Sequence, residues 1–361
     1  MSHFVLAAGG TGGHMMPAHA LAEELMRRGH HVALVTDERG TRFPGLFKNV
    51  ATHVLPAGRL GGGPLGYLRA ARSIWAGRAM ALRLFESFRP SAVMGFGGYP
   101  ALPSLLAAFS AKIPTAVHEQ NAVLGRVNRL VAGRVDAVAT AYPDVQRLPR
   151  KAEDKVRLVG NPVREEVLEL REQPYPALDA DGVFRVLVTG GSQGAKVLSD
   201  VVPDGLGLLP PLFRARLQVT HQARAEDIDA VRVKYAKHGI PAELATYLPD
   251  LPERLGLAHL VIARSGASTV AELAAAGRPA ILVPFAAATD DHQTYNAREL
   301  VAAGGARSIP QAQFTAVELA KQMQKLGLEP DALINAARRA HSVGRPHAVT
   351  DLADLIEEIG R

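Results

Sequence analysis

The sequence Phe4-Val-Leu-Ala-Ala-Gly-Gly-Thr-Gly-Gly-His14 decides the fold, and a related stretch, Val186-Leu-Val-Thr-Gly-Gly-Ser-Gln-Gly-Ala195, opens the second half of the chain. Each stretch has the pattern of a short apolar strand, a glycine turn and a helix. Glycine suits such a turn because it adopts backbone angles that other residues avoid and lets the backbone approach a ligand. A helix that begins behind the turn points its free N–H groups toward that ligand. The two copies predict two nucleotide-binding domains.

Strand and helix patterns alternate along both halves of the chain. Strands are expected at Phe4–Ala8, His31–Thr36, Ala92–Met94, Thr115–Val117 and Ala137–Ala139, and again at Phe184–Thr189, Leu217–Thr220, Leu260–Ala263 and Ala280–Val283. Helices are expected near Pro17–Arg28, Pro100–Ser110, Leu124–Ala132 and His347–Ile359. This alternation predicts an α/β fold with parallel sheets that are covered on both faces.

The sequence Gly160-Asn-Pro-Val-Arg164 interrupts this pattern and is expected to be a hinge. We therefore expect an N-terminal domain over residues 1–161 and a C-terminal domain over residues 162–342, both Rossmann-like and doubly wound, facing a cleft. The final helix is amphipathic, so residues 343–361 are expected to pack back on the N-terminal domain.

Composition narrows the class of protein. Of the 361 residues, 47% are hydrophobic and 21% charged, which is typical of a globular protein. The absence of cysteine excludes disulfides and thiolate chemistry. Neither a secretory signal nor a membrane-spanning run is expected. The formal charge of +6 and the pI near 9.6 favour an anionic partner.

The glycine turns leave two interpretations open: phosphate or acceptor binding, or only a tight strand-to-helix connection. A dinucleotide-binding enzyme is a rival, because Asp37 closes the second strand where a ribose-binding acid would lie. However, Met15 occupies the third glycine position of that motif. A third turn, Met94-Gly-Phe-Gly-Gly-Tyr-Pro100, also follows a strand. Three such turns favour a ligand site at the carboxyl edge of the sheets.

Two loops of the second half are rich in polar residues. Arg264-Ser-Gly-Ala-Ser-Thr-Val-Ala-Glu272 follows a strand and opens a helix, so it suits either a diphosphate seat or a helix cap. Pro284-Phe-Ala-Ala-Ala-Thr-Asp-Asp-His-Gln-Thr-Tyr-Asn296 follows the next strand. Its Gln293 could bridge two sugar hydroxyls, although such a cluster can also be a helix cap.

Five motifs occur in the order of a known family: Gly9-Gly-Thr-Gly-Gly-His14, His118-Glu-Gln-Asn121, Gly160-Asn-Pro-Val-Arg164, Gly190-Gly-Ser-Gln-Gly-Ala195 and Arg264-Ser-Gly-Ala-Ser-Thr-Val-Ala-Glu272. The chain thereby resembles the bacterial MurG family of UDP-N-acetylglucosamine transferases, which form lipid II for peptidoglycan. The resemblance implies the glycosyltransferase-B arrangement of two domains. It also implies inverting transfer of GlcNAc from UDP-GlcNAc to the C4 hydroxyl of MurNAc in undecaprenyl-linked lipid I.

The resemblance also implies roles for individual residues. Glycine-loop residues Thr11, Gly12 and Gly13 would line the junction of donor and acceptor, and Ser192 would hold the diphosphate. Glu272 would bind the ribose, Leu248 the uracil through its main chain, and Gln293 beside His292 the sugar hydroxyls. The sequence Asp290-Asp-His-Gln293 belongs to a variable stretch, so the resemblance leaves open which of these side chains binds the sugar. Further substrate contacts are expected at Asn121, Asn128, Arg164, Arg264, Ala267, Ser268, Thr269 and Val270.

The first candidate for the general base is His14, directly behind the first glycine turn, with His118 and Glu119 as alternatives. His14 could instead only hold a backbone carbonyl. No cofactor and no metal are expected. The two Asp-x-Asp sequences, Asp179-Ala-Asp181 and Asp227-Ile-Asp229, are predicted in a turn and on an exposed helix face rather than at a strand end.

The segment Arg59–Arg89 interleaves basic and apolar residues and includes the sole tryptophan, Trp75. Such a pattern suits either an anionic membrane surface or an ordinary helix whose arginines are solvated. With a lipid-linked acceptor, we expect peripheral attachment to the cytoplasmic face of the bacterial inner membrane and no nucleic-acid partner. The alternatives are a UDP-GlcNAc 2-epimerase, a glycosyltransferase acting on diacylglycerol, and a non-catalytic nucleotide-sugar-binding subunit.

Overall fold

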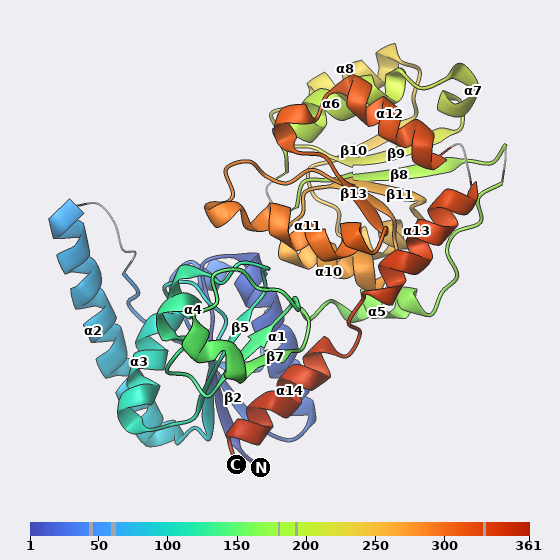
Figure 1. The fold of residues 1–361 in the computed structure, drawn as a ribbon. Coiled ribbons are helices and arrows are strands. Elements are labelled where there is room, and N and C mark those ends of the chain that lie inside the picture. The colour runs from blue at the N-terminus through green and yellow to red at the C-terminus, as the bar shows by residue number, and fades with distance from the viewer. Residues whose placement is uncertain (43–45, 59–62, 180, 192–193, 328–329) are drawn as a thin grey trace. The chain divides into compact units, whose positions relative to one another are not determined.

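The computed structural model describes residues 1–361 except 43–45, 59–62, 180, 192–193 and 328–329. The chain divides into two compact units (Figure 1). The first unit comprises residues Met1–Val163 together with Pro346–Arg361, and the second comprises Arg164–Arg345. Each unit is built around its own parallel sheet.

The sheet of the first unit has seven strands in the order β3-β2-β1-β4-β5-β6-β7. The strands are β1 (His3–Ala7), β2 (His31–Thr36), β3 (Ala51–Val54), β4 (Ala92–Gly95), β5 (Thr115–Glu119), β6 (Ala137–Thr140) and β7 (Val156–Leu158). The helices are α1 (Gly12–Arg27), α2 (Gly63–Phe88), α3 (Ala101–Ala111), α4 (Arg126–Val131) and α14 (Ala348–Ile359), with short 3₁₀ turns at Gly40–Arg42 and Arg150–Lys155.

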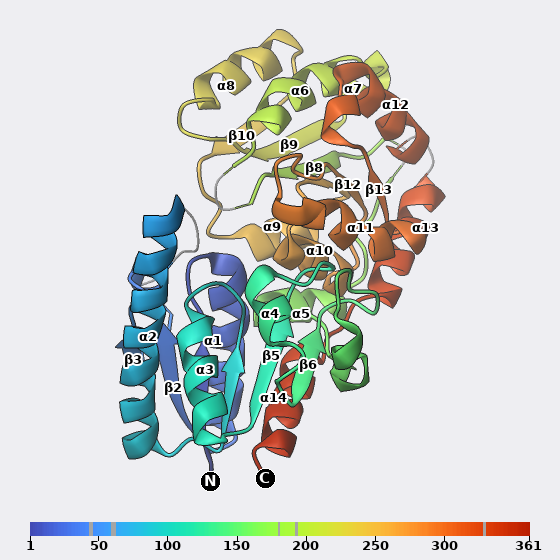
Figure 2. The same cartoon turned by 60° about the vertical axis from the view of Figure 1, so that its left-hand side comes forward.

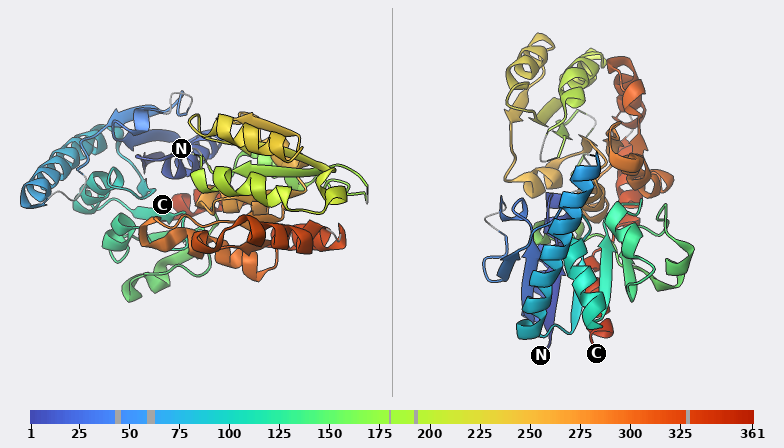
Figure 3. Two further views of the ribbon diagram at one scale, coloured as in Figure 1. Left: turned by 90° about the horizontal axis from the view of Figure 1, so that it is seen from above. Right: turned by 90° about the vertical axis from the view of Figure 1, so that its left-hand side faces the viewer.

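Alternate residues of β1 face opposite sides of this sheet and both sides are buried. Phe4 and Leu6 pack with α1 and α14, whereas Val5 and Ala7 pack with α2, α3 and α4. Figure 2 shows α2 and α3 on their face of the sheet. The last helix, α14, thus packs into the core of the first unit, and the two termini lie near each other (Figure 3). Arg28, directly after α1, pairs with Asp354 and Glu357 of α14.

The second unit has six strands in the order β10-β9-β8-β11-β12-β13. The strands are β8 (Phe184–Thr189), β9 (Leu217–Gln222), β10 (Ala242–Ala245), β11 (Leu260–Ala263), β12 (Ala280–Leu282) and β13 (Ala306–Ser308). The helices are α5 (Glu165–Arg171), α6 (Lys196–Gly207), α7 (Pro211–Arg214), α8 (Ile228–Lys237), α9 (Leu251–Leu257), α10 (Ala267–Ala275), α11 (His292–Ala302), α12 (Ala316–Gly327) and α13 (Pro330–Ser342), with 3₁₀ turns at Thr289–Asp291 and Gln311–Gln313. Its main core joins β8, β9 and β11 to α6, α8 and α12.

These sheets confirm the prediction of two Rossmann-like α/β domains with parallel strands. The predicted start of the first helix was wrong. α1 begins at Gly12, directly behind the glycine turn, and not at Pro17, which lies inside the helix. Pro17 is the sixth residue of this helix, so the helix continues through it without the N–H hydrogen bond to the carbonyl four residues earlier, while the fixed φ angle of proline stays helical.

Helix α2 has an unusually apolar exposed surface. Leu65, Leu68 and Trp75 are more than half exposed, whereas Ala81 and Phe85 are buried against the sheet. In Figure 1 the N-terminal half of α2 extends beyond α3. Among the described residues, no helix is both long and apolar enough to cross a membrane.

Candidate active site

The first glycine turn lies at the C-terminal end of β1. A Cβ atom on Gly9 would lie 2.8 Å from the Oδ1 atom of Asp37, so only glycine fits there without a shift. Thr11 has an extended backbone and makes no capping hydrogen bond through its side chain. The first N–H groups of α1, at Gly12 and Gly13, are therefore not consumed by that side chain and can face a ligand.

His14 is half-buried near the start of α1. Its Nδ1 atom lies 3.1 Å from the main-chain oxygen of Gly9. Because a carbonyl oxygen only accepts, the neutral ring carries its proton on Nδ1 and has a lone pair on Nε2. Burial lowers the pKa of His14, although the Gly9 hydrogen bond and the negative charge of Glu119 oppose this. His14 is therefore neutral near pH 7 and can accept a proton on Nε2.

The third glycine turn packs against the same imidazole ring. Gly97 and Gly98 have φ angles of +84° and +71°, which side chains other than glycine disfavour. A Cβ atom on Gly97 would lie 3.4 Å from His14 Nε2, and one on Gly98 would lie 3.3 Å from its Cε1. The ring is thus held between two glycine turns that come from β1 and β4.

His118 and Glu119 end β5 beside His14, but both side chains are occupied. The Nε2 atom of His118 lies 2.9 Å from the oxygen of Gly160, and its Nδ1 lies 3.0 Å from Gln120 Nε2. Burial lowers the pKa of His118 to about 4. The Glu119 carboxylate accepts from Gly125 N at 2.7 Å and from two asparagines. In this structure the ring nitrogens of His118 and the carboxylate of Glu119 are therefore engaged in hydrogen bonds within the protein.

Asn121 and Asn128 are the two asparagines that Glu119 holds. The Nδ2 atom of Asn128 donates to Glu119 at 2.9 Å and to the His118 carbonyl at 3.1 Å. Its Oδ1 atom is buried without a hydrogen-bond partner in the described part of the chain. The backbone N–H of Asn121 donates to Glu119 at 3.1 Å. We call His14, Gly97, Gly98, Glu119 and Asn128 the His14 cluster.

In the second unit, the matching turn lies between β8 and α6. A Cβ atom on Gly190 would lie 2.4 Å from the nitrogen of Ala195, so the chain passes too closely there for a side chain. Ser192, which was expected to hold the diphosphate, lies outside the described residues.

The N-terminus of α10 is fixed by α11. Ser265 Oγ donates to the Gln293 carbonyl at 2.8 Å, and Asn296 Nδ2 donates to the Ser265 carbonyl at 3.1 Å. The helix begins behind Gly266, with no side-chain cap. Its first three residues, Ala267, Ser268 and Thr269, are partly exposed, whereas Val270 is buried. The start of α10 thus presents backbone donors on a rigid support, as an anion seat requires.

Glu272 lies one helical turn further along α10 and pairs with Arg164. The Nε and Nη2 atoms of Arg164 both lie 2.9 Å from Glu272 Oε1. Burial raises the pKa of Glu272, while the charge of Arg164 lowers it. We call the start of α10, Arg164 and Glu272 together the α10 cluster.

Arg264 is directed into the protein. Its Nη1 atom donates to the carbonyls of Val283 and Pro284 at 3.0 and 3.1 Å, and its guanidinium lies over the Phe285 ring. Burial lowers its pKa. In this structure, Arg264 therefore holds the loop after β12 through its Nη1 atom.

The residues expected at the sugar lie at the start of α11. His292 Nδ1 contacts the Thr289 carbonyl at 2.8 Å, and Gln293 Oε1 accepts from Phe285 N at 2.9 Å. Asp290 and Asp291 have φ angles of +56° and +55°, a conformation that costs energy and is frequent at functional sites. In this structure Gln293 uses its oxygen to hold the preceding loop.

Leu248 follows β10 and is buried, so its main chain rather than its side chain can face a ligand.

Sequence reasoning assigned no role to Gln120 or Gln222. The Gln222 amide oxygen accepts from Thr189 Oγ1 at 2.7 Å, and its nitrogen donates to the Thr246 carbonyl at 3.3 Å. An amide at the carboxyl end of a strand was the available signal for both residues.

The rival ribose-binding acid, Asp37, is occupied: it accepts from Arg39 at 2.8 Å and from Gly40 N at 3.2 Å. Among the residues that the structure describes, no group of three or more His, Asp or Glu side chains could hold a metal ion.

Two Rossmann-like units with glycine turns at their strand ends are the architecture of two-domain glycosyltransferases, and the comparison with known families identifies the class. The glycosyltransferase family 28 N-terminal domain matches residues 4–140, and the family 28 C-terminal domain matches residues 185–357. The chain belongs to glycosyltransferase family 28.

Relatives with one shared name match nearly the whole chain. The UDP-N-acetylglucosamine–N-acetylmuramyl-(pentapeptide) pyrophosphoryl-undecaprenol N-acetylglucosamine transferase of Zymomonas mobilis is 66% identical over 99% of this chain and 92% of its own length. The enzyme of that name from Novosphingobium aromaticivorans is 64% identical, over 99% and 92% respectively.

Solved structures agree with this grouping. Acinetobacter baumannii MurG has a TM-score of 0.83 at 30% identity and covers 99% of this chain and 100% of its own. A UDP-GlcNAc 2-epimerase from Neisseria meningitidis has a TM-score of 0.71 at 14% identity, covering 99% and 100%, which shows the fold alone.

Proposed function

We propose that this chain transfers GlcNAc from UDP-GlcNAc to the C4 hydroxyl of MurNAc in lipid I and so forms lipid II for peptidoglycan synthesis. The observation that carries the proposal is the 66% identity to a relative of that name over 99% of the chain. The geometry of the His14 and α10 clusters supports the proposal.

We assign the donor to the α10 cluster. The uncapped start of α10 offers N–H groups and the positive end of the helix dipole to the diphosphate. Glu272 lies one turn away, which suits hydrogen bonds from the two ribose hydroxyls to its carboxylate. Arg164 orients that carboxylate at 2.9 Å. The main chain at Leu248 would read the uracil, and His292 and Gln293 would read the sugar.

We assign the acceptor and the base to the His14 cluster. The O4–H of MurNAc gives its proton to His14 Nε2, and the oxygen attacks the anomeric carbon of GlcNAc. The bond from that carbon to the UDP oxygen breaks on the opposite face, so the product has the inverted configuration. A positioned base of this kind contributes roughly 10²- to 10⁴-fold in rate. N–H groups at the leaving diphosphate stabilise the charge that develops there.

We further propose that α2 attaches the protein to the cytoplasmic face of the inner membrane. Leu65, Leu68 and Trp75 expose apolar surface on a helix that also carries arginines. Arg78 lies 5.1 Å from the Trp75 ring, so cationic and apolar groups share one surface. Arg59, also expected in this surface, lies outside the described residues. A lipid-linked acceptor would reach the enzyme from that membrane.

The test incubates the purified protein with labelled UDP-GlcNAc, with and without a soluble lipid I analogue. We expect UDP release and a β-linked disaccharide only when the acceptor is present. His14→Ala should lose at least about 100-fold in kcat, whereas His31→Ala, at the opposite end of the sheet, should retain activity. Conversion of the UDP-sugar without acceptor would identify an epimerase instead. UDP-GlcNAc binding without turnover would identify a binding subunit.

A further inference from the structure

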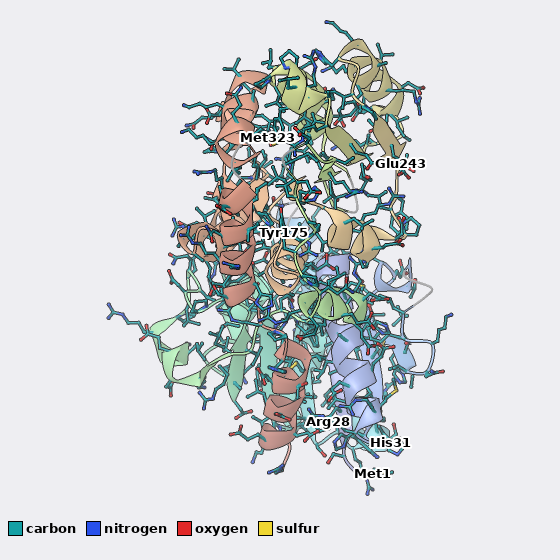
Figure 4. The ribbon with its side chains drawn as sticks, turned by 90° about the vertical axis from the view of Figure 1, so that its right-hand side faces the viewer. Met1, Arg28, His31, Tyr175, Glu243 and Met323 are labelled. Carbon is teal, nitrogen blue, oxygen red and sulfur yellow. The ribbon has the colours of Figure 1, made fainter. Side chains whose placement is uncertain are left out.

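The second unit contains a cavity of about 460 Å³ that neither cluster uses. Its walls come from the segment after α5, the loop after α10, and one face of α13. Tyr175, labelled in Figure 4, belongs to the first of these walls. Because α10 starts at the proposed donor site, this cavity lies at the other end of the same helix.

A buried cation forms one wall of the cavity. Arg278 is only 2% exposed, and its guanidinium donates to the carbonyls of Leu255, Gly256, Ala276 and Gly277 at 2.9, 2.9, 2.8 and 3.4 Å. No carboxylate of the described chain pairs with it. Buried charges are ordinarily paired with an opposite charge, so this one leaves the cavity with a net positive field.

Two more arginines line the same cavity. Arg171 Nη1 donates to the carbonyls of His341 and Ala275 at 3.1 and 3.4 Å. Arg338 is exposed on α13 and has no hydrogen-bond partner in the described part of the chain. The lining contains no Asp or Glu among the residues described. Glu172, next to Arg171, is exposed and does not line the cavity.

The remaining wall is apolar. Pro176, Leu178, Ile334 and Ala337 line it together with the Tyr175 ring. The Tyr175 hydroxyl donates to the His259 carbonyl at 2.6 Å, and its ring lies 5.7 Å from the Arg278 guanidinium. The hydroxyl is therefore occupied and the ring is fixed in place. A cavity with an apolar wall and convergent cations suits a small molecule with both properties.

We propose that this cavity is a regulatory site for a small organic anion with a flat apolar body, such as an aromatic carboxylate. The carboxylate would pair with Arg338 at the entrance under the field of Arg171 and Arg278, and the body would pack on Tyr175 and Ile334. The site is separate from the donor and acceptor clusters.

The regulatory part rests on the proposed function, because it requires UDP at the start of α10. Arg171 and Arg278 bind carbonyls at the C-terminal end of α10, at Ala275 and Ala276. Glu272 lies in the last turn before that end. A ligand that draws these arginines toward the cavity changes how they hold α10. It therefore alters the affinity for UDP, and UDP alters the affinity for the ligand by the same factor.

The test titrates the full-length protein with 1-naphthoate, and with the neutral 1-naphthamide, by calorimetry. We expect saturable binding of the carboxylate with one site per chain and at least about tenfold weaker binding of the amide. Arg338→Glu should weaken naphthoate binding about tenfold. The control Arg339→Glu makes the same charge change one residue away, in a side chain that lines a different cavity, and should change binding less than about threefold. Equal effects of the two variants, or no saturable binding, would overturn the site.

Naphthoate is then titrated at increasing UDP. A site coupled to α10 gives a change in naphthoate affinity that levels off at saturating UDP. Competition that never levels off would place naphthoate in the UDP site and overturn the proposal. No change would overturn the regulatory role. Absence of UDP binding by the unmodified protein would count against the proposed function, whereas the titration without UDP tests the cavity independently.

Discussion

His14 donates its Nδ1 proton to the main-chain oxygen of Gly9 over 3.1 Å, and this hydrogen bond leaves Nε2 as the basic atom of the ring. Gly9 in turn lies so close to Asp37 that no side chain fits at its Cα. The turn that makes the first helix start at Gly12 therefore also fixes the tautomer of the proposed base. The fold and the chemistry depend on the same few backbone atoms.

The first prediction concerns the pH dependence of transfer. Burial lowers the pKa of His14 below its ordinary value of 6.5, so the neutral form persists down to a lower pH than in a free histidine. We expect kcat/KM to fall with decreasing pH through a limb that lies below pH 6.5. Rate profiles across pH 4 to 9, about the range in which His titrates, would measure it. If kcat/KM were instead retained at low pH and fell only above pH 6.5, the role of His14 as a neutral base would be contradicted.

The second prediction separates binding from stability at Glu272. Burial raises the pKa of this carboxyl, so its ionised form is penalised in the folded state, and the stability it gives at low pH is lost as pH rises through the raised pKa. Glu272→Gln removes that penalty together with the ion pair to Arg164. We therefore expect the free energy of unfolding at pH 7 to change by less than about 1 kcal/mol.

In the same variant, the affinity for UDP should fall about tenfold, because an amide accepts more weakly than a carboxylate. Urea unfolding and calorimetric titration with UDP would measure the two quantities. Unchanged UDP affinity would show that the Arg164–Glu272 pair is only structural. Glu299→Gln is the control, because it makes the same change on α11 and breaks the ion pair with Arg345.

The central strands could be predicted from sequence and the edge strands could not. β1, β2, β4, β5 and β6 of the first sheet, and β8, β9, β11 and β12 of the second, match apolar runs because both of their faces are buried. The four strands that sequence reasoning missed, β3, β7, β10 and β13, are the four sheet edges. Their short sequences, such as Ala306-Arg-Ser308, carry polar residues because one side faces solvent.

The site was only partly predictable, because several of its side chains are positioned by contacts between residues that are distant in the sequence. The glycine turns were visible because backbone geometry requires glycine. The sequence placed His118 and Glu119 at the end of a strand but did not show that Gly160 and Gly125 occupy them, because those contacts join residues that are up to 42 positions apart. Nor did it show that Arg264 turns inward to Val283.

The third prediction uses two glycines with similar backbones. Gly29 and Gly98 have φ angles of +83° and +71°. An added methyl group at Gly29 meets nothing within 4 Å, whereas one at Gly98 lies 3.3 Å from His14 Cε1. Both Ala variants should lose about 1 to 2 kcal/mol of stability from the strained φ angle.

Only Gly98→Ala should also lower kcat, by about tenfold or more, because it displaces the imidazole ring. Thermal unfolding and transfer assays on both variants would separate the two effects. Equal retention of activity in Gly29→Ala and Gly98→Ala would mean that the third glycine turn does not position His14.

The last prediction tests the proposed membrane surface of α2. Leu65 and Leu68 are 71% and 68% exposed, and burying a leucine side chain in lipid yields about 1.5 to 3 kcal/mol when burial is complete. The double variant Leu65→Ser/Leu68→Ser should therefore bind vesicles containing phosphatidylglycerol at least about tenfold more weakly in sedimentation assays. Leu212→Ser is the control, because Leu212 is 87% exposed but belongs to α7 of the second unit. Transfer to a soluble acceptor should be unchanged in all three proteins, since none of these leucines belongs to either cluster. If Leu212→Ser weakened vesicle binding as much as the α2 variant, attachment would follow from general surface hydrophobicity and not from α2.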